Sequence, residues 1–447
     1  MLIEFSVGNF LSFKETVTFS MVSASIKEHP KNTFESGKFK LLKSAEIYGA
    51  NASGKSNLLK AMDFMKGFVQ NSSKESQVFQ KIKVENFRLS TETEGKPSFF
   101  EIIFLEKGTR FTYGFEVDAN KVHSEWLLCA PKGSDRKLFK RVGQEFELGR
   151  DFREGKGLED KTRKNALFVS VVAQFNGEIS TGVLKYFSDL RMLFDGVLRT
   201  FTPQKAQNPK FKNKILNFLK IADLGINDFL TKPRTLEQKF IEVLAKENTN
   251  DLFQKGISLF QGLTENELSE ISESMNSPLA NENIFDVLIS HSKFDESGKP
   301  ISEVNFDLDK NESDGTSRLF YLSGYVIDAL ENGKILIVDE LESSLHPNLM
   351  EFIVNLFNSE FNKNNAQLIF TTHNTNLLSN NFFRRDQIWF AEKDRFGATE
   401  LFSLVEFKEK ARNDSTFDKN YLLGFYGAVP LVGFPEEIYF EAENEQK

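Results

Sequence analysis

The stretch AEIYGANASGKSNLLKAMDFM occupies residues 45–65 and decides the fold. Within it, residues 49–56 (GANASGKS) fit the pattern G-x-x-x-x-G-K-S. A short apolar strand is predicted at 45–48, and apolar residues at helical spacing predict a helix over 56–68. This strand–loop–helix order is the context that the motif requires. The sequence therefore predicts an α/β core built around a phosphate-binding loop.

The residue types in this loop suit a polyphosphate. Glycines allow backbone N–H groups to close around phosphates, and the helix N-terminus adds the positive end of its dipole. We expect Lys55 to reach the terminal phosphates and the Ser56 hydroxyl to face Mg²⁺. The expected nucleotide-binding set is Gly49, Asn51, Ala52, Ser53, Gly54, Lys55, Ser56 and Asn57.

A second motif is ILIVDE (335–340), a predicted buried strand that ends in two carboxylates. Such an ending is usually structural, but after a phosphate-binding loop we favour a functional role. Asp339 is expected to hold the Mg²⁺ shell. Glu340 is expected to orient or deprotonate the attacking water.

Two further polar residues follow predicted buried strands. His373 ends the run LIFTTH and is expected to sense the γ-phosphate or align the water, although a satisfied, half-buried histidine is the alternative. The apolar run 166–173 predicts a strand, and Gln174 follows it. We expect Gln174 to bind Mg²⁺ and the attacking water, the alternative being a solvent-facing loop residue.

The stretch ESDGT (312–316) begins a predicted helix. Ser313 or Asp314 suits a helix cap, and Gly315 suits a tight turn. The other interpretation is that this turn contacts a nucleotide held by another chain.

Six segments are predicted along the chain. They are an N-terminal lobe of the core with the phosphate-binding loop (1–96), an antiparallel β-subdomain (97–160), a core strand with its glutamine loop (161–180), a mostly helical insertion (181–300), a C-terminal lobe of the core (301–405) and a C-terminal extension (406–447). The elements predicted within these segments include a β-hairpin with its turn at Lys107-Gly108, helical spacing at 236–247, helices over 317–331 and 347–358, a strand over 367–371 and a hairpin over 387–404.

Composition narrows the function classes. The 447 residues carry a net charge of −8, so the chain is not an obvious polyanion binder, although residues 131–141 and 205–214 are locally basic. The single cysteine, Cys129, excludes a disulfide framework within the chain and fits a reducing cytosol. No apolar run approaches the roughly 20 residues of a membrane span, and no signal peptide is evident. We therefore expect a cytoplasmic protein.

These motifs and their order resemble the ABC-type ATPases that include SMC and RecF-like chromosome and repair proteins. The resemblance implies that ATP and Mg²⁺ are ligands. It also implies that residues 312–316 stand where these ATPases carry the ABC signature motif, and that residues 341–347 stand where they carry the D-loop. Ser313 and Gly315 match the signature, whereas Asp314 and Thr316 depart from it. Glu342 stands where Asp is more usual.

A closer resemblance, to AAA-family ATPases of bacterial abortive-infection and related anti-phage systems, covers most of the chain. The chain departs from this family at Phe425, where the family would carry an arginine. Any role of that arginine is therefore in doubt for this chain. The resemblance implies an ATPase subunit that works with a separately encoded nuclease or toxin, and a phage-derived trigger is conceivable. It rests on NFLSF (9–13), ADLGI (222–226), ESDGTSRLF (312–320), DELESSLHP (339–347), QLIFTTHNTNLL (367–378), RRDQIWFAEKD (384–394) and YLLGFYGAVP (421–430).

The expected mechanism is ATP-dependent closure of a head-to-tail homodimer, or of a higher homo-oligomer, with Ser313 and Gly315 acting in trans. One alternative is a DNA-repair or chromosome ATPase that clamps DNA, in which the basic runs line a local groove. A stand-alone nuclease is disfavoured, because only about 40 residues follow the last predicted hairpin and their sequence shows no acidic metal cluster. DNA is thus an optional partner, and no membrane partner is expected.

Overall fold

The computed structural model describes most of the chain, namely residues 1–74, 80–131, 133–194, 199–234, 285–407 and 416–430. The chain divides into two compact units. Unit 1 comprises residues 1–192, 329–342 and 350–447, and unit 2 comprises residues 193–328 and 343–349.

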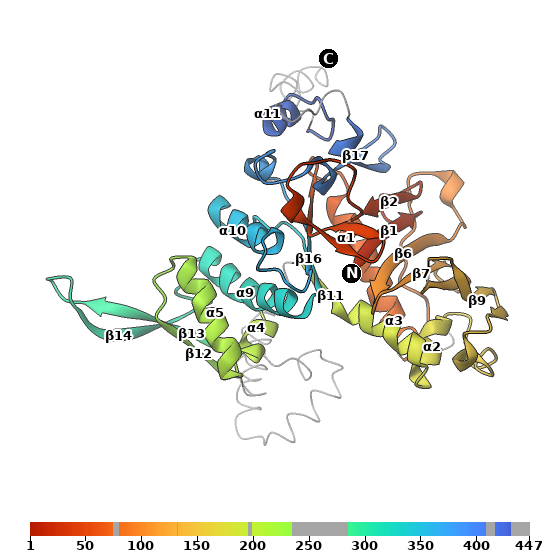
Figure 1. The fold of residues 1–447 in the computed structure, drawn as a ribbon, viewed down its shortest axis with the longest axis horizontal. Coiled ribbons are helices and arrows are strands. Elements are labelled where there is room, and N and C mark those ends of the chain that lie inside the picture. The colour runs from red at the N-terminus through yellow and green to blue at the C-terminus, as the bar shows by residue number, and fades with distance from the viewer. Residues whose placement is uncertain (75–79, 132, 195–198, 235–284, 408–415, 431–447) are drawn as a thin grey trace, which may run out of the picture. The chain divides into compact units, whose positions relative to one another are not determined.

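Unit 1 contains a six-stranded core sheet in the order β11-β15-β16-β5-β17-β18. Strands β11, β16 and β17 of this sheet are labelled in Figure 1. Strands β15, β16, β5 and β17 run parallel, and β18 pairs antiparallel with β17. The carboxyl ends of these four parallel strands therefore meet at one edge of the sheet, where open α/β sheets bind ligands. The strands are β5 (Ser44–Tyr48), β11 (Leu190–Leu193), β15 (Ile335–Val338), β16 (Gln367–Thr371), β17 (Ile388–Lys393) and β18 (Thr399–Ser403).

The helices of the core follow from their apolar spacing. Helix α1 (Lys55–Asn71) buries Leu58, Leu59, Met62 and Met65, which recur on one face of a 3.6-residue period. Helices α9 (Asp314–Asn332) and α10 (Pro347–Asn358) precede and follow β15. The predicted helices at 56–68, 317–331 and 347–358 are thus confirmed, as is the predicted hairpin at 387–404.

A second sheet in unit 1 has seven antiparallel strands in the order β10-β9-β8-β7-β6-β1-β2. The hairpin predicted at Lys107-Gly108 is confirmed, and both residues have positive φ (47° and 77°), as in the turns that suit twisted hairpins. Because β1 and β2 join this sheet, it is not confined to 97–160. The strands are β1 (Leu2–Gly8), β2 (Val17–Ser20), β6 (Ser98–Glu106), β7 (Thr109–Val117), β8 (Val122–Ala130), β9 (Arg136–Val142) and β10 (Glu145–Leu148).

The strand predicted at 166–173 is wrong, because Phe168–Gln174 forms helix α2, followed by α3 (Glu178–Asp189). Residues 168–172 are all buried and, apart from Ser170, apolar, so the sequence shows no helical period there. The buried Glu125 carboxylate accepts hydrogen bonds from the backbone N–H groups of Phe168 (2.6 Å) and Val169 (3.0 Å) and so caps α2.

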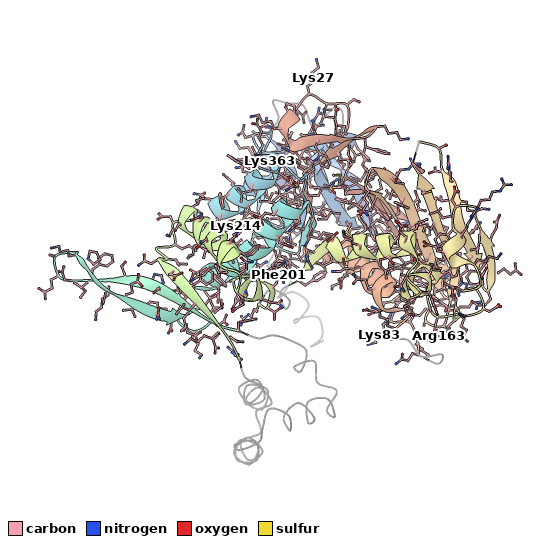
Figure 2. The ribbon with its side chains drawn as sticks, turned by 60° about the horizontal axis from the view of Figure 1, so that its bottom comes forward. Lys27, Lys83, Arg163, Phe201, Lys214 and Lys363 are labelled. Carbon is pink, nitrogen blue, oxygen red and sulfur yellow. The ribbon has the colours of Figure 1, made fainter. Side chains whose placement is uncertain are left out.

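Unit 2 combines helices with a small sheet. Helices α4 (Phe201–Lys205) and α5 (Pro209–Ile221) agree with the predicted helical insertion. The ring of Phe201, labelled in Figure 2, stacks on Tyr325 of α9 with ring centroids 4.4 Å apart. The antiparallel sheet of β12 (Asp228–Pro233), β13 (Phe285–Phe294) and β14 (Pro300–Asp307) was not predicted. The helical pattern at 236–247 lies outside the described residues.

Shorter elements complete the described parts of unit 1. Strands β3 (Thr33–Ser36) and β4 (Phe39–Leu42) form a two-stranded sheet, and α11 (Phe417–Leu422) follows the core. No helix in the described ranges is both long and apolar enough to cross a membrane. Single 3₁₀ turns lie at Pro30–Asn32, Thr91–Thr93, Arg153–Gly155, Thr375–Leu377, Arg385–Gln387 and Leu404–Glu406.

Candidate nucleotide-binding site

The phosphate-binding loop connects β5 to α1 at the carboxyl edge of the core sheet. Gly54 caps α1 with φ 112°, a conformation that L side chains rarely adopt. A Cβ at Gly54 would collide with the Thr399 side chain, and one at Gly49 would collide with the Ala391 carbonyl. Both glycines are therefore required by close approach of neighbouring atoms.

A cluster of hydroxyl groups supports the loop from behind. Thr399 Oγ1 donates to the Ser53 carbonyl (2.8 Å) and lies 2.7 Å from Ser12 Oγ. Asn57 Nδ2 donates to the same Ser12 Oγ (2.8 Å). Ser12 and Thr399, which are 387 positions apart, were not among the predicted site residues. The one sequence feature that pointed to this contact was the NFLSF stretch around Ser12.

Lys55 lies inside the loop with only 5% of its surface exposed. Its Nζ donates to the carbonyls of Gly49 (2.9 Å) and Ala50 (3.1 Å). Burial lowers the pKa of Lys55 to about 8, and the carboxylates of Glu342, Glu340 and Asp339 oppose this shift. If a phosphate binds in the loop, the ammonium group would exchange its neutral carbonyl partners for a charged phosphate oxygen.

Asp339 follows β15 and joins two hydroxyl groups. Its Oδ1 accepts hydrogen bonds from Ser56 Oγ (3.0 Å) and from Thr371 Oγ1 at the end of β16 (2.7 Å). A carboxylate beside a serine hydroxyl is a set of oxygen donors that suits Mg²⁺. The two residues predicted to share a metal ion are therefore brought together, and Thr371, which was not predicted, orients the carboxylate.

Glu340 adopts a left-handed backbone conformation with φ 49°. Its backbone N–H donates to Thr371 Oγ1 at 2.7 Å, so one threonine positions both acidic residues. A non-glycine residue in this region costs about 1–2 kcal/mol, and such strain concentrates at functional sites. The conformation leaves the Glu340 side chain exposed beyond the strand end.

His373 lies at the end of the neighbouring strand β16. Its backbone N–H donates to the Glu342 carboxylate, so the segment after β15 contacts the segment after β16. Burial lowers the pKa of the His373 imidazole, with the nearby Lys55 as the next cause. The ring is therefore neutral at pH 7 and can both donate and accept a hydrogen bond.

A cavity of about 920 Å³ opens over the first half of the loop. This volume lies within the usual range of small-molecule sites. Ser53 Oγ, a buried hydroxyl of this loop, has no hydrogen-bond partner among the described residues. Four segments of unit 1 line the cavity, namely the loop (49–53), the segment after β16 with His373 and Thr375, the end of β17 (391–393) and the C-terminal segment 421–430. The sequence analysis assigned no role to that last segment.

The predicted signature turn belongs to unit 2. Ser313 Oγ accepts a hydrogen bond from the Thr316 N–H (3.1 Å), so the helix-cap interpretation is confirmed. Gly315 lies in the first turn of α9, where a Cβ would lie 2.6 Å from the Ser344 carbonyl oxygen. The turn therefore packs directly on the segment predicted to be the D-loop.

Gln174 lies on a helix, not in a loop after a strand. It is the exposed last residue of α2, and α2 contacts the far end of α1 through Ser170 Oγ and the Val69 carbonyl (2.5 Å). Val69 lies 14 residues after Lys55, which corresponds to about 21 Å along a helix. The structure thus does not bring Gln174 to the phosphate-binding loop.

The two basic runs are largely paired with acids. In the run 131–141, Arg136 contacts Asp151 (3.5 Å) and Lys137 contacts Glu147. In the run 205–214, Lys212 contacts Asp228 at 2.8 Å. Such pairing removes much of the charge that a nucleic-acid groove would need.

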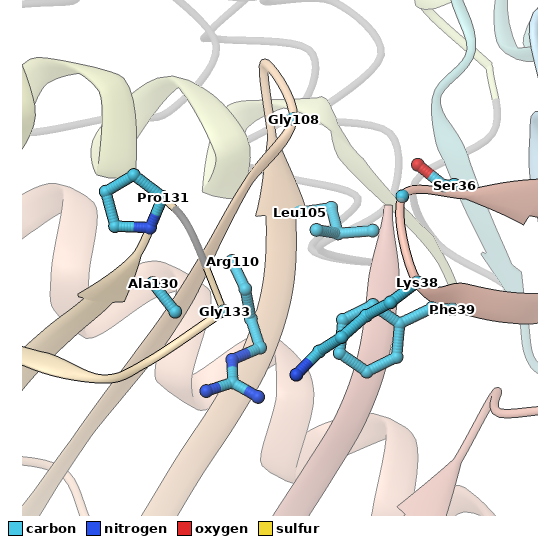
Figure 3. A pocket seen from close by; sticks show the side chains of 10 residues that line it. Ser36, Lys38, Phe39, Leu105, Gly108, Arg110, Ala130, Pro131 and Gly133 are labelled. Carbon is cyan, nitrogen blue, oxygen red and sulfur yellow. The ribbon is translucent and has the colours of Figure 1, made fainter.

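A smaller cavity of about 270 Å³ lies beside the 131–141 run (Figure 3). Lys38 and Arg110 extend along it, and Arg110 also pairs with Asp135. None of the residues predicted to bind nucleotide lines this cavity.

Comparison with solved structures gives distant similarities. The SMC head domain from Thermotoga maritima is 13% identical with a TM-score of 0.39, over 90% of this chain and 98% of that chain. An Smc head domain bound to the C-terminal domain of ScpA derived from Pyrococcus furiosus is 12% identical with a TM-score of 0.38, over 92% and 98%. No curated protein matches the chain.

One family model matches residues 46–379, well over half of the chain. The matched range begins in β5 and ends six residues after His373, so it spans the phosphate-binding loop and the acidic pair. Its description reads "AAA domain, putative AbiEii toxin, Type IV TA system". The chain belongs to this family of AAA domains.

Proposed function

We propose that this protein hydrolyses ATP and acts as the switch subunit of a bacterial anti-phage system of the abortive-infection type. The observation that carries the ATPase proposal is the joining of Ser56, Asp339 and Thr371 by two hydrogen bonds at the mouth of the phosphate-binding loop. Three segments that are far apart in the sequence meet there, and they supply groups that would bind a nucleoside triphosphate and its metal ion.

The residues of unit 1 divide the chemistry among them. Lys55 and the loop N–H groups bind the phosphates, and Ser56 and Asp339 would hold Mg²⁺, which when bound neutralises developing phosphate charge. Glu340 accepts a proton from the attacking water, since its carboxylate is exposed at the strand end. His373, neutral at pH 7, donates a hydrogen bond toward the γ-phosphate.

The switch requires a second copy of the chain. Ser313 caps the 19-residue helix α9, whose N-terminus carries the positive end of a helix dipole. We propose that Ser313 and Gly315 of one copy close on the γ-phosphate held by the other. ATP then favours the closed pair, and hydrolysis releases it.

The effector is a separately encoded nuclease or toxin. The family description names a toxin of a type IV toxin–antitoxin system, which supports a partner of this class. The pairing of the basic runs with acids favours a protein effector over DNA as the principal partner.

The Glu340→Gln variant tests the ATPase proposal. Loss of a general base costs typically 10²–10⁴-fold in rate, so we expect hydrolysis to fall at least about 100-fold while ATP binding persists. Glu296→Gln, at an exposed glutamate in unit 2, is the matched control and should match the wild type. Full activity of Glu340→Gln would refute the assignment. Hydrolysis stimulated by DNA with a steep salt dependence would favour a DNA clamp instead.

The same variant tests the effector proposal, because it should hold the closed state. With ATP present, tagged Glu340→Gln should capture the product of the neighbouring gene more strongly than the wild type does. Equal capture with and without ATP would contradict a nucleotide-controlled partner.

A further inference from the structure

Tyr48 lies between the phosphate-binding loop and the switch histidine. It is the last residue of β5, directly before Gly49, and its side chain is fully buried. The phenol donates a hydrogen bond to the Asn374 carbonyl at 3.0 Å. Asn374 is the residue after His373, so a side chain from the first residue before the loop holds the backbone of the switch segment.

The switch segment is tied to β5 on both sides of His373. On the N-terminal side, the Thr372 N–H donates to the Ile47 carbonyl (3.1 Å). On the C-terminal side, the tie is the Tyr48 phenol. Deleting that phenol would remove this bond to the Asn374 carbonyl while leaving the β16–β5 pairing in place.

The Glu46 carboxyl group contacts the Tyr48 phenol. Glu46 is fully buried, and its Oε2 lies 3.3 Å from the Tyr48 oxygen. Burial raises the pKa of the Glu46 carboxyl well above its usual range, which favours the neutral form of the group. A neutral carboxyl can donate its proton to the Tyr48 oxygen, which leaves the single phenolic hydrogen for the Asn374 carbonyl.

The Tyr48 ring also reaches the C-terminal segment. It packs against the Tyr421 ring with centroids 5.8 Å apart, and Tyr421 stacks on Phe390 of β17 at 5.5 Å. Tyr421 and His373 both line the 920 Å³ cavity. One buried residue thus contacts the backbone beside His373, and its aromatic neighbour Tyr421 lines the same cavity as His373.

We propose that Tyr48 is a positioning residue for hydrolysis, which acts by fixing His373 through the Asn374 carbonyl. The inference rests on the proposed ATPase function. It makes the phenolic oxygen, rather than the ring, the group that matters for rate.

The Tyr48→Phe variant removes that oxygen and keeps the ring. Because the phosphate contacts remain, ATP should bind within about twofold of the wild type. We expect kcat to fall by about tenfold, since small misplacements of reacting groups cost one to two orders of magnitude. The matched control is Tyr113→Phe, at another buried tyrosine whose phenol bonds a buried glutamate (Glu125, 3.1 Å), here in the antiparallel sheet. The Tyr113→Phe variant should lose a comparable amount of stability, and its kcat should equal that of the wild type.

Two further variants separate positioning from stability. Glu46→Gln keeps a neutral group that can donate to the phenol, so kcat should stay within about threefold of the wild type. If Tyr48 acts through His373, Tyr48→Phe combined with His373→Ala should be no slower than His373→Ala alone. Fully multiplicative losses would overturn the inference.

The outcomes distinguish this inference from the function on which it rests. A wild-type chain that binds ATP without hydrolysing it refutes the proposed hydrolysis. A wild-type chain that hydrolyses ATP, with Tyr48→Phe at wild-type kcat, refutes the positioning role alone. If Tyr48→Phe lowers kcat only as far as Tyr113→Phe does, the phenol is structural and the inference fails.

Discussion

At the scale of single residues, the buried ammonium of Lys55 gives the site a pH dependence. Burial lowers the Lys55 pKa to about 8 in the nucleotide-free chain. The charged form binds phosphate, so affinity should be constant below pH 8 and fall above it. The limiting slope is about tenfold per pH unit for one linked proton. Titration of a non-hydrolysable ATP analogue between about pH 7.5 and about pH 9.5 measures it.

The control for this prediction is Lys55→Arg. A guanidinium stays charged throughout this range, so any affinity that the variant retains should be independent of pH. Equal pH dependence in both proteins would assign the titration to another group.

The residues that could be predicted are those within one contiguous motif. Lys55 and Ser56 sit at fixed positions in the loop pattern, and Asp339 ends an unmistakable buried strand. Thr371, Ser12 and Thr399 could not be predicted, because their roles arise from contacts with residues dozens to hundreds of positions away. A threonine in a strand gives no local sign that it will orient a carboxylate.

At the scale of elements, the turn from the loop into α1 depends on its close contact with β18. In Gly54→Ala, the new Cβ would meet the Thr399 side chain in a backbone conformation unsuited to alanine. Strain of about 1–2 kcal/mol and overpacking of about 1–3 kcal/mol should together lower the free energy of unfolding by at least 2 kcal/mol. Urea denaturation measures this loss.

Gly37→Ala provides the comparison. Gly37 also has positive φ (61°), but a Cβ there would meet nothing within 4 Å. The loss of stability in Gly37→Ala should therefore be limited to the backbone strain. Equal destabilisation by both substitutions would show that the contact with Thr399 does not matter.

Most elements could be predicted because their periods are clear. Helix α10 was predicted with the bounds that the structure shows, and so was β16. Helix α2 could not be, because a seven-residue helix buried among Phe and Val side chains reads like a strand. The sheet of β12, β13 and β14 was missed because β14 is almost wholly exposed and lacks a buried face to set its alternation.

At the scale of the whole molecule, the predicted site residues are distributed over both units. The phosphate-binding loop, the acidic pair and His373 belong to unit 1, whereas Ser313 and Gly315 belong to unit 2. We propose that the unit 2 residues serve the nucleotide of a second copy. That arrangement makes each complete site a product of two chains.

Mixing two inactive variants tests this claim most directly. Lys55→Ala lacks the phosphate contact, and Ser313→Arg lacks the trans contact. Asn208→Arg, which removes the side-chain cap of α5, controls for loss of a helix cap and should stay active. Each inactive variant alone should hydrolyse no ATP. In an equal mixture half of the dimers are mixed, and each has one complete site, so activity should return to about a quarter of wild type. A mixture as inactive as its components would contradict the account.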